Sequence, residues 1–145
     1  MFFRSMKISD TYRVIELLRQ IGNADFVPPS KWWFAIRLLF PTFHVFVLED
    51  DSGAIVAMVF LNLLSNPKYG WRGYIDYVVV DKSARRNGFG RKIMEGTLAR
   101  AKKLGCQEVL LTTSNPDAQA LYESLGFRVR SGRNFSKVIS ESCGF

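Results

Sequence analysis

A glycine-containing turn between a buried strand and a long helix constrains the fold more than any other feature of the sequence. Residues 74–80 (YIDYVVV) are rich in β-branched and aromatic side chains, which is typical of a buried strand. Residues 88–104 then place apolar side chains along one side of a helix that Gly105 can end. A further strand is predicted at 108–113, so the sequence predicts a βαβ unit and a parallel strand pair.

The other segments extend this unit into one mixed sheet. With 145 residues the chain is long enough for a single core, and 48% hydrophobic residues is normal for a folded domain. Further helices are predicted at residues 10–22, 31–40 and 115–126. Further strands are predicted at residues 2–9, 43–50, 54–64, 127–132 and 135–140. We therefore predict one domain of the α/β class over residues 1–145.

The turn itself, ARRNGFGRK at residues 84–92, has the properties of an anion site. Backbone N–H groups at the start of a helix are unpaired, and the helix dipole adds partial positive charge there. Glycine at positions 88 and 90 lets the backbone approach a ligand closely. The spacing excludes a P-loop and the dinucleotide fingerprint, because neither Gly-Lys-Ser/Thr nor a third glycine follows. The pattern alone leaves two interpretations, a pyrophosphate cradle and a tight turn with a basic rim.

Positive charge is concentrated in the same part of the chain. The formal net charge is +7, and eight of the 20 basic residues lie between Lys82 and Lys103, where Glu95 is the one acidic residue. The rest of the chain has equal numbers of basic and acidic residues. Such a field favours an anionic partner. Cys106 and Cys143 have no disulfide or metal-site spacing, and no apolar run is long enough to span a bilayer.

Two blocks of the sequence resemble the GNAT family of N-acetyltransferases. VVVDKSARRNGFGRKIM (78–94) is similar to the family's acyl-CoA-binding motif, Gln/Arg-x-x-Gly-x-Gly/Ala, with Arg85, Gly88 and Gly90 in its three positions. SNPDAQALYESLGF (114–127) resembles the later motif, in which asparagine precedes a short helix with Leu-Tyr and a closing Gly-Phe. The resemblance implies the family's fold, a mostly antiparallel sheet with a splayed parallel strand pair and about four flanking helices.

The resemblance also implies that acetyl-CoA is the cosubstrate and that no metal takes part. In the family, the backbone after the glycine turn holds the pyrophosphate, and an open strand edge and an asparagine contact the pantetheine arm. Carried over to this sequence, the residues expected at coenzyme A are Val78, Val79, Val80, Arg85, Arg86, Asn87, Gly88, Phe89, Gly90, Arg91, Asn115 and Tyr122.

Direct transfer of the acetyl group to a primary amine is the reaction that the resemblance implies. Tyr122 stands at the position of the family's proton donor to the leaving thiolate. A tyrosine suits this role because its pKa of about 10 keeps it protonated until the thiolate forms. A main-chain N–H near Val78 or Val79 would stabilise the oxyanion. Asp76 is the best candidate for the base that deprotonates the amine, and Glu49 and His44 are weaker candidates. Each of these two residues also has a purely structural interpretation. Tyr122 could be a ring of the core, and Asp76 could be a strand residue on a solvated face.

The acceptor amine is less constrained by the sequence. Trp32, Trp33 and Tyr77 are predicted to line its site, although the two tryptophans equally suit a core or a dimer face. The stretch GYIDYVVVD is locally similar to glucosamine-6-phosphate N-acetyltransferases, and a phosphate would find basic partners in Arg128, Arg130 and Arg133. Peptide N-termini, lysines, aminoglycosides and polyamines stay open.

The favoured partner is thus a small-molecule or peptide amine, rather than a membrane or nucleic acid. A basic nucleic-acid or ribosome binder and a coenzyme A-binding module without catalysis are the alternatives. Reduced thiols favour a cytoplasmic protein, and an exposed terminal strand allows a homodimer.

Overall fold

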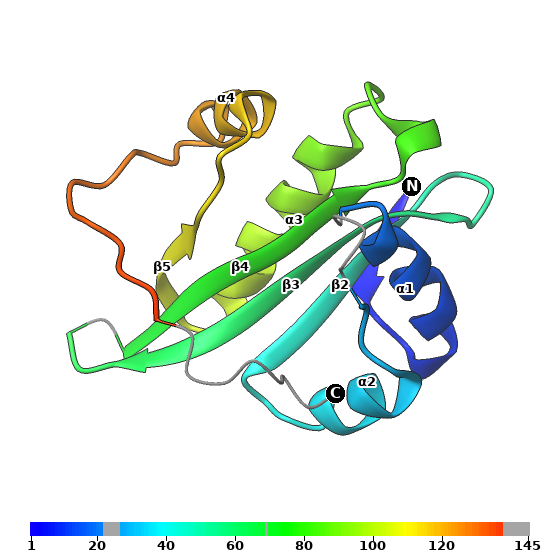
Figure 1. Ribbon diagram of the computed structural model, residues 1–145, viewed down its shortest axis with the longest axis horizontal. Helices are drawn as coiled ribbons and strands as arrows, with labels where there is room; N and C mark the ends of the chain where they lie inside the picture. The colour runs from blue at the N-terminus through cyan, green and yellow to red at the C-terminus, as the bar shows by residue number, and fades with distance from the viewer. Residues whose placement is uncertain (22–26, 69, 138–145) are drawn as a thin grey trace.

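One five-stranded sheet forms the centre of the protein. The computed structural model describes residues 1–21, 27–68 and 70–137 (Figure 1). Its strands follow one another in the order β1 (Phe2–Ser5), β2 (Phe43–Glu49), β3 (Ile55–Asn66), β4 (Gly70–Val80) and β5 (Cys106–Leu111). Neighbouring strands are antiparallel, except that β4 and β5 are parallel. The predicted mixed sheet with one parallel strand pair is therefore confirmed.

Helices cover both faces of this sheet. They are α1 (Thr11–Arg19), α2 (Lys31–Arg37), α3 (Phe89–Lys103) and α4 (Pro116–Ser124), with short 3-10 helices η1 (Ile8–Asp10) and η2 (Lys82–Ala84). Figure 1 shows α1 and α2 in front of the sheet and α3 behind it. None of the helices in the described ranges is long and apolar enough to cross a membrane.

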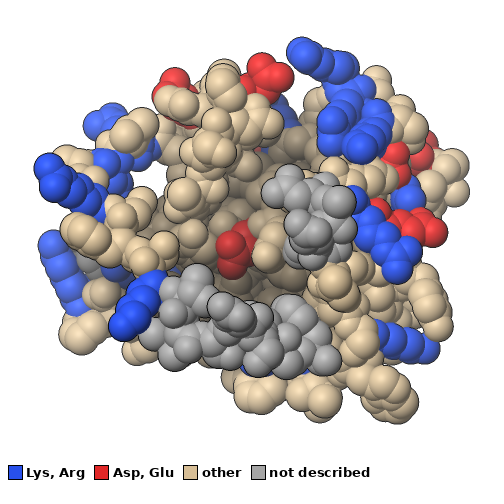
Figure 2. Space-filling model, in the orientation of Figure 1, with Lys and Arg blue, Asp and Glu red and all other residues tan. Residues whose placement is uncertain are grey.

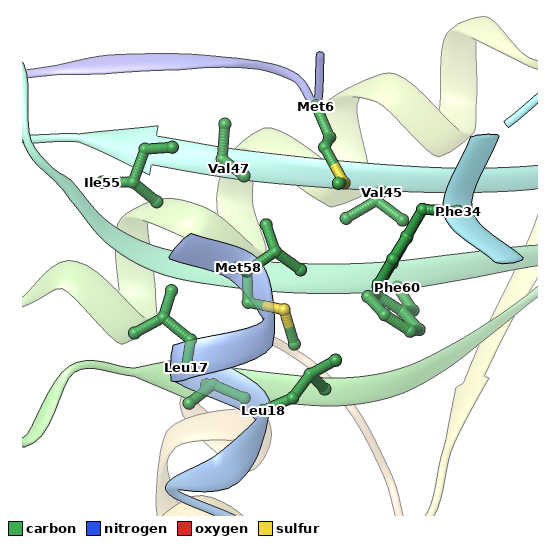
Figure 3. Packing of buried hydrophobic residues seen from close by; sticks show 11 residues of the cluster. Met6, Leu17, Leu18, Phe34, Val45, Val47, Ile55, Met58 and Phe60 are labelled. Carbon is green, nitrogen blue, oxygen red and sulfur yellow. The ribbon is translucent and has the colours of Figure 1, made fainter. Parts of the chain in front are cut away.

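The two faces of the sheet bury separate apolar clusters, because alternate side chains of a strand point to opposite faces. In β2, Val45 and Val47 join the cluster under α1 and α2, whereas Phe46 and Leu48 join the cluster under α3. Figure 3 shows the first cluster, in which Leu17 and Leu18 of α1 and Phe34 of α2 pack over the strands. In the second cluster the fully buried residues of α3 include Ile93 and Met94.

The predicted glycine turn and the helix that follows it are both present. Gly88 is the N-cap residue of α3 and has a left-handed backbone (φ 77°), which glycine adopts without a steric penalty. Gly105 follows the helix, also with positive φ (88°). Asn115 caps α4 through its side chain, which accepts a hydrogen bond from Asp117 N at 3.0 Å. The cap and stop residues therefore mark these two helices as the sequence predicts.

The predicted strands near the C-terminus differ from the structure. After α4, residues 127–137 contain no strand, so the prediction of a strand at 127–132 is wrong. Phe127 and Val129 alternate with arginines, which mimics a strand, but Val129 is 80% exposed and the segment is not paired with β5. Figure 1 shows this segment looping outward beyond β5. The predicted strand at 135–140 has no strand in its first three residues; its remainder, like Cys143, lies outside the described residues.

A polar network at the end of β4 joins the glycine turn to α1. Asp81 is 7% exposed, and one carboxylate oxygen accepts hydrogen bonds from Ser83 N (2.8 Å) and Ser83 Oγ (2.6 Å). Its other oxygen accepts from Arg13 Nη2 and from Gln20 Nε2. The Gln20 side chain in turn accepts a hydrogen bond from Lys82 N at 2.9 Å. These bonds fix the first residues after β4 against α1, and therefore fix where the glycine turn begins.

The Asp81 network predicts an acid-sensitive stability. Hydrogen bonds from Ser83, and then from Arg13 and Gln20, hold the pKa of Asp81 well below its usual range. A carboxyl group with a depressed folded-state pKa stabilises the fold above its unfolded pKa of about 3.9, and this contribution is lost as pH falls toward the folded value. Asp81→Asn is expected to lower the free energy of unfolding by about 2 kcal/mol at pH 7. The difference from the parent should shrink below about pH 4.

Urea unfolding between pH 3 and pH 7 measures this difference. Asp50→Asn is the matched control, because Asp50 accepts the same serine bonds, from Ser52 N (2.9 Å) and Ser52 Oγ (2.7 Å), in an exposed turn that gives it no arginine partner among the described residues. A pH-independent difference for Asp81→Asn, or equal losses for both variants, would contradict a stabilising role of the ionised Asp81 network.

Candidate active site

The site is centred on a change in the pairing of β4. Its parallel pairing with β5 ends at Ile75, opposite Leu111, although β4 continues to Val80. On the other side β4 stays paired with β3, as far as Val80 opposite Ala57. Residues 76–80 of β4 therefore have no β5 partner, and the two parallel strands separate there. Backbone N–H and C=O groups on such an edge need hydrogen-bond partners from elsewhere.

A β-bulge lies at the same point of β4. Phe60 and Met58 of β3 face Asp76 and Val79, so Val59 alone stands opposite the two residues Tyr77 and Val78. Tyr77 has a positive φ of 49°, which is uncommon for a tyrosine. The bulge interrupts the normal alternation of the strand. As a result, the neighbouring residues Asp76 and Tyr77 both line one cavity on the α1 and α2 side of the sheet.

This cavity, called here the Asp76 cavity, has a volume of about 330 Å³. It lies between α1, α2 and the strands β2, β3 and β4, and Figure 2 shows the molecule hollowed on this face, over the sheet. Asp76 is half-buried, and Asn62 Nδ2 donates a hydrogen bond to its Oδ2 at 3.3 Å. Burial raises the pKa of Asp76 above its ordinary value. A carboxylate with a raised pKa in a cavity is a candidate general base.

The structure separates the two tryptophans that were predicted to line an amine site. Trp33 and Tyr77 both line the Asp76 cavity. Trp32 does not line the cavity, and its side chain is 78% exposed. The reason is geometric, because consecutive residues of a helix point about 100° apart. A site-lining role for Trp32 is therefore not supported by its position.

The glycine turn stands at the far end of the unpaired part of β4. Arg86 and Gly88 both have positive φ (66° and 77°), and Asn87 closes the turn by donating from Nδ2 to Ala84 O (3.1 Å) and Arg85 O (3.2 Å). A Cβ at Gly88 would have no neighbour within 4 Å, whereas one at Gly90 would lie 3.3 Å from Leu121 Cδ2 of α4. Gly88 therefore opens the turn to a ligand, and Gly90 permits close packing of α3 on α4.

Helix α4 carries the remaining predicted residues. Tyr122 is 9% exposed and belongs to the apolar cluster under α3, where its ring lies 5.9 Å from that of Phe127. Burial raises the pKa of the Tyr122 phenol above its ordinary value, so the group is protonated at neutral pH. Tyr122 also lines a second cavity of about 1440 Å³ beside β5 and α4. Asn115 uses its side-chain oxygen as the α4 cap, which leaves its amide nitrogen as a donor.

Other candidates lie away from Asp76. His44 stacks on Phe46 on the α3 side of the sheet, 2.9 Å from Pro41 O, and burial lowers its pKa. Glu49 accepts a hydrogen bond from Arg4 Nε at 2.7 Å, at the β1–β2 pair. Neither residue lines the Asp76 cavity. The three arginines proposed to meet a phosphate line the second cavity instead: Arg128, Arg130 and Arg133. Within residues 1–21, 27–68 and 70–137 no group of three His, Cys, Asp or Glu side chains could hold a metal ion.

Two parts of the site could not be, or were not, predicted from the sequence. The bulge at Tyr77 has no sequence signal, because glycine, the residue that usually marks positive φ, is absent there. Asn62 was also missed, although a lone amide in the apolar run VFLNLL does signal a polar contact on one face of a strand.

Comparisons with known proteins agree with this geometry. Residues 12–127 match the Acetyltransferase (GNAT) family. Glucosamine 6-phosphate N-acetyltransferase of Arabidopsis thaliana is 31% identical over 137 residues, which cover 88% of this chain and 90% of that protein. N-alpha-acetyltransferase 30 of Homo sapiens is 39% identical over 95 residues, covering 64% of this chain and 25% of the relative. The match thus spans about a quarter of that second protein.

Solved structures are similar over nearly the whole chain. The crystal structure of glucosamine-6-phosphate N-acetyltransferase from Arabidopsis thaliana has a TM-score of 0.77 and 26% identity, and the match covers 96% of this chain and 98% of that one. A putative acetyltransferase from Agrobacterium tumefaciens str. C58 has a TM-score of 0.82 and 25% identity, covering 94% and 100% of the two chains. The sequence matches, the fold and the site agree, and the chain belongs to the GNAT family of acetyltransferases.

Proposed function

We propose that this protein is an acetyl-CoA-dependent N-acetyltransferase, which transfers an acetyl group to a primary amine by direct attack in a ternary complex. The observation that carries the proposal is the separation of β4 from β5 after Ile75. The freed part of β4 leads from a cavity with a half-buried carboxylate directly to the glycine turn at the start of α3. One strand therefore connects a place for an amine with a place for a phosphate-bearing cosubstrate.

The chain's own groups fit coenzyme A at the glycine turn. The N-terminal N–H groups of α3, a helix of 15 residues, face an open position at Gly88, and they would hold the pyrophosphate. The edge of β4 at Val78 to Val80, which β5 does not pair, and the amide nitrogen of Asn115 would hold the pantetheine arm. Acetyl-CoA supplies an acetyl group that is activated as a thioester.

Asp76 would accept the proton of the attacking amine. A primary ammonium of pKa about 10 is almost fully protonated at neutral pH and must lose its proton before it can attack. The pKa of Asp76 is raised by burial, which makes this carboxylate a stronger base than an exposed aspartate. Asn62 orients the group by its hydrogen bond to Oδ2.

Tyr122 would return a proton on the thiolate side of the reaction. It lies on the α3 and α4 side of the sheet, whereas Asp76 lies on the α1 and α2 side. The freed part of β4 stands between these two faces. A main-chain N–H near Val78 or Val79 would stabilise negative charge on the acetyl oxygen.

Two alternatives from the sequence are less well supported. A basic nucleic-acid binder would not need the separated strands or the cavity at Asp76, and the relatives reported above are named as acetyltransferases. A coenzyme A-binding module without catalysis would need neither a proton donor such as the buried Tyr122 nor a base such as the half-buried Asp76 beside the opened strand. A cytoplasmic location and a homodimer stay predictions.

Gly88→Val tests the cosubstrate site. A β-branched side chain at φ 77° strains the turn and occupies the open position in front of the α3 amides. The affinity for acetyl-CoA, measured by calorimetry, should fall at least about tenfold, a change of about 1.4 kcal/mol. Gly53→Val is the matched control, because Gly53 has nearly the same backbone (φ 83°) and equally open surroundings in the β2–β3 turn. Equal affinities for both variants would show that the turn does not hold the cosubstrate.

Tyr122→Phe tests the proton donor. Loss of the hydroxyl should reduce kcat by about 100-fold, since a general acid contributes at least about that factor, with little change in acetyl-CoA affinity. Tyr74→Phe serves as control, because Tyr74 also lines the second cavity but its hydroxyl bonds Thr112 Oγ1 at 3.3 Å. Release of free thiol measures turnover, and an unchanged kcat for Tyr122→Phe would remove this residue from the mechanism.

Asp76→Asn tests the base through the pH dependence of the rate. At pH 7 the amine is protonated and the base is needed, so kcat/KM should fall by about 100-fold. As pH approaches the amine pKa of about 10, the amine arrives neutral and the deficit should shrink. A rate–pH profile with the same shape and height as that of the parent would exclude Asp76 as the base.

A further inference from the structure

The wall of the Asp76 cavity is a row of aromatic rings. Trp33 of α2, Phe43 of β2, Phe60 of β3 and Tyr77 of β4 lie edge to face in this order, with 5.5 Å between the centroids of each successive pair. Phe34 supports the row from the core, 6.0 Å from Phe60, and Figure 3 shows these two rings side by side. Rings held by neighbours on both sides form a rigid apolar surface.

Few polar groups interrupt this wall. Among the described residues that line the cavity, Asp76 is the one carboxylate, Thr42 and Asn62 are neutral polar residues, and Tyr77 and Trp33 add a phenol hydroxyl and an indole N–H. Arg37 is the one cation, and its guanidinium lies 5.5 Å from the centroid of Trp33 and 5.9 Å from that of Phe40. This stacking turns Arg37 into part of the wall. On the face in Figure 2, Lys and Arg lie mostly toward the outline of the molecule.

We infer that the acceptor is a primary amine carried on an apolar body the size of one aromatic or large branched side chain. The inference rests on the proposed function and names the substrate class of its acceptor site. An ammonium group would pair with the Asp76 carboxylate, and the apolar body would replace water along the row of rings. The volume of about 330 Å³ is at the lower end for ligand sites, which suits a body of this size.

Sugar phosphates and polyamines fit the cavity less well. A hexosamine phosphate brings several hydroxyl groups and a dianion, whereas the described lining offers few polar side chains and one cation, Arg37, whose guanidinium is stacked on Trp33 and Phe40. A polyamine brings further ammonium groups, whereas the described lining offers one carboxylate. Two sources share the favoured chemistry, a free arylalkyl amine and the N-terminal residue of a peptide with a large apolar side chain.

The test compares kcat/KM for acetyl-CoA-dependent thiol release across a defined amine panel. It contains 2-phenylethylamine, ethylamine, a short peptide beginning with phenylalanine, a matched peptide beginning with glycine, glucosamine 6-phosphate and spermidine. We expect 2-phenylethylamine or the phenylalanine peptide to exceed glucosamine 6-phosphate and spermidine by at least about 100-fold. Comparison of 2-phenylethylamine with the phenylalanine peptide shows whether the acceptor is a free arylalkyl amine or a peptide N-terminus.

Each other outcome has a distinct meaning. If glucosamine 6-phosphate or spermidine is the best acceptor, the inferred substrate class is wrong while the proposed function stands. Equal rates for ethylamine and 2-phenylethylamine, together with equal rates for the two peptides, also overturn it. If acetyl-CoA binds but none of the amines releases thiol, the proposed function fails and the inference fails with it.

A pair of tryptophan variants ties the preference to this cavity. Trp33→Ala removes the outer ring of the row and should raise KM for the preferred apolar amine by about tenfold, with KM for acetyl-CoA unchanged. Trp32→Ala removes the same side chain from the exposed side of the same helix and should leave both KM values unchanged. Thermal unfolding and acetyl-CoA affinity show whether each variant is folded. A folded Trp33→Ala with the parent's KM for the apolar amine would overturn the inference.

Discussion

The rest of the structure depends on the point at which β4 loses its pairing with β5. Up to Ile75 the strand is paired on both sides, and beyond it β3 is its single partner. The bulge opposite Val59 begins two residues later, at Tyr77, and directs Asp76 and Tyr77 to the same face. Opening of the sheet and creation of the cavity therefore occur within three residues of one strand. These two changes in pairing place the cavity and the open strand edge next to each other.

A strand that loses a neighbour must be held by other contacts if it is to keep a defined geometry. The freed part of β4 is held at its start by the row of rings, through the contact of Tyr77 with Phe60. At its end, Asp81 N donates to Val56 O at 2.8 Å, and the Asp81 carboxylate binds Arg13 and Gln20 of the α1 region. An aromatic contact at one end and hydrogen bonds at the other thus hold the part of β4 that lacks a β5 partner.

Local sequence signals predicted the helix ends that particular residue types favour. Gly88 and Asn115 mark the starts of α3 and α4, because positive φ and side-chain capping favour these residue types. Features that depend on tertiary pairing were not accessible in this way. The alternation at residues 127–132 resembles a strand, yet pairing requires an edge that accepts it, and the segment does not pair with β5. Trp33 lines the cavity and Trp32 is exposed because of which face of α2 meets the sheet, and the sequence does not specify that face.

Part of the excess positive charge has structural contacts next to the glycine turn. Two of the arginines around the glycine turn reach α4: Arg91 Nη2 donates to Ser124 Oγ at 2.6 Å, and Arg86 lies 4.0 Å from the Asp117 carboxylate. Both Arg86 and Asp117 are about nine-tenths exposed, so this ion pair contributes little to stability. Arg85 Nε donates to Val80 O at 3.4 Å. These side chains connect the turn to β4 and to the helix that carries Tyr122. Their charge also adds to the positive potential around the turn.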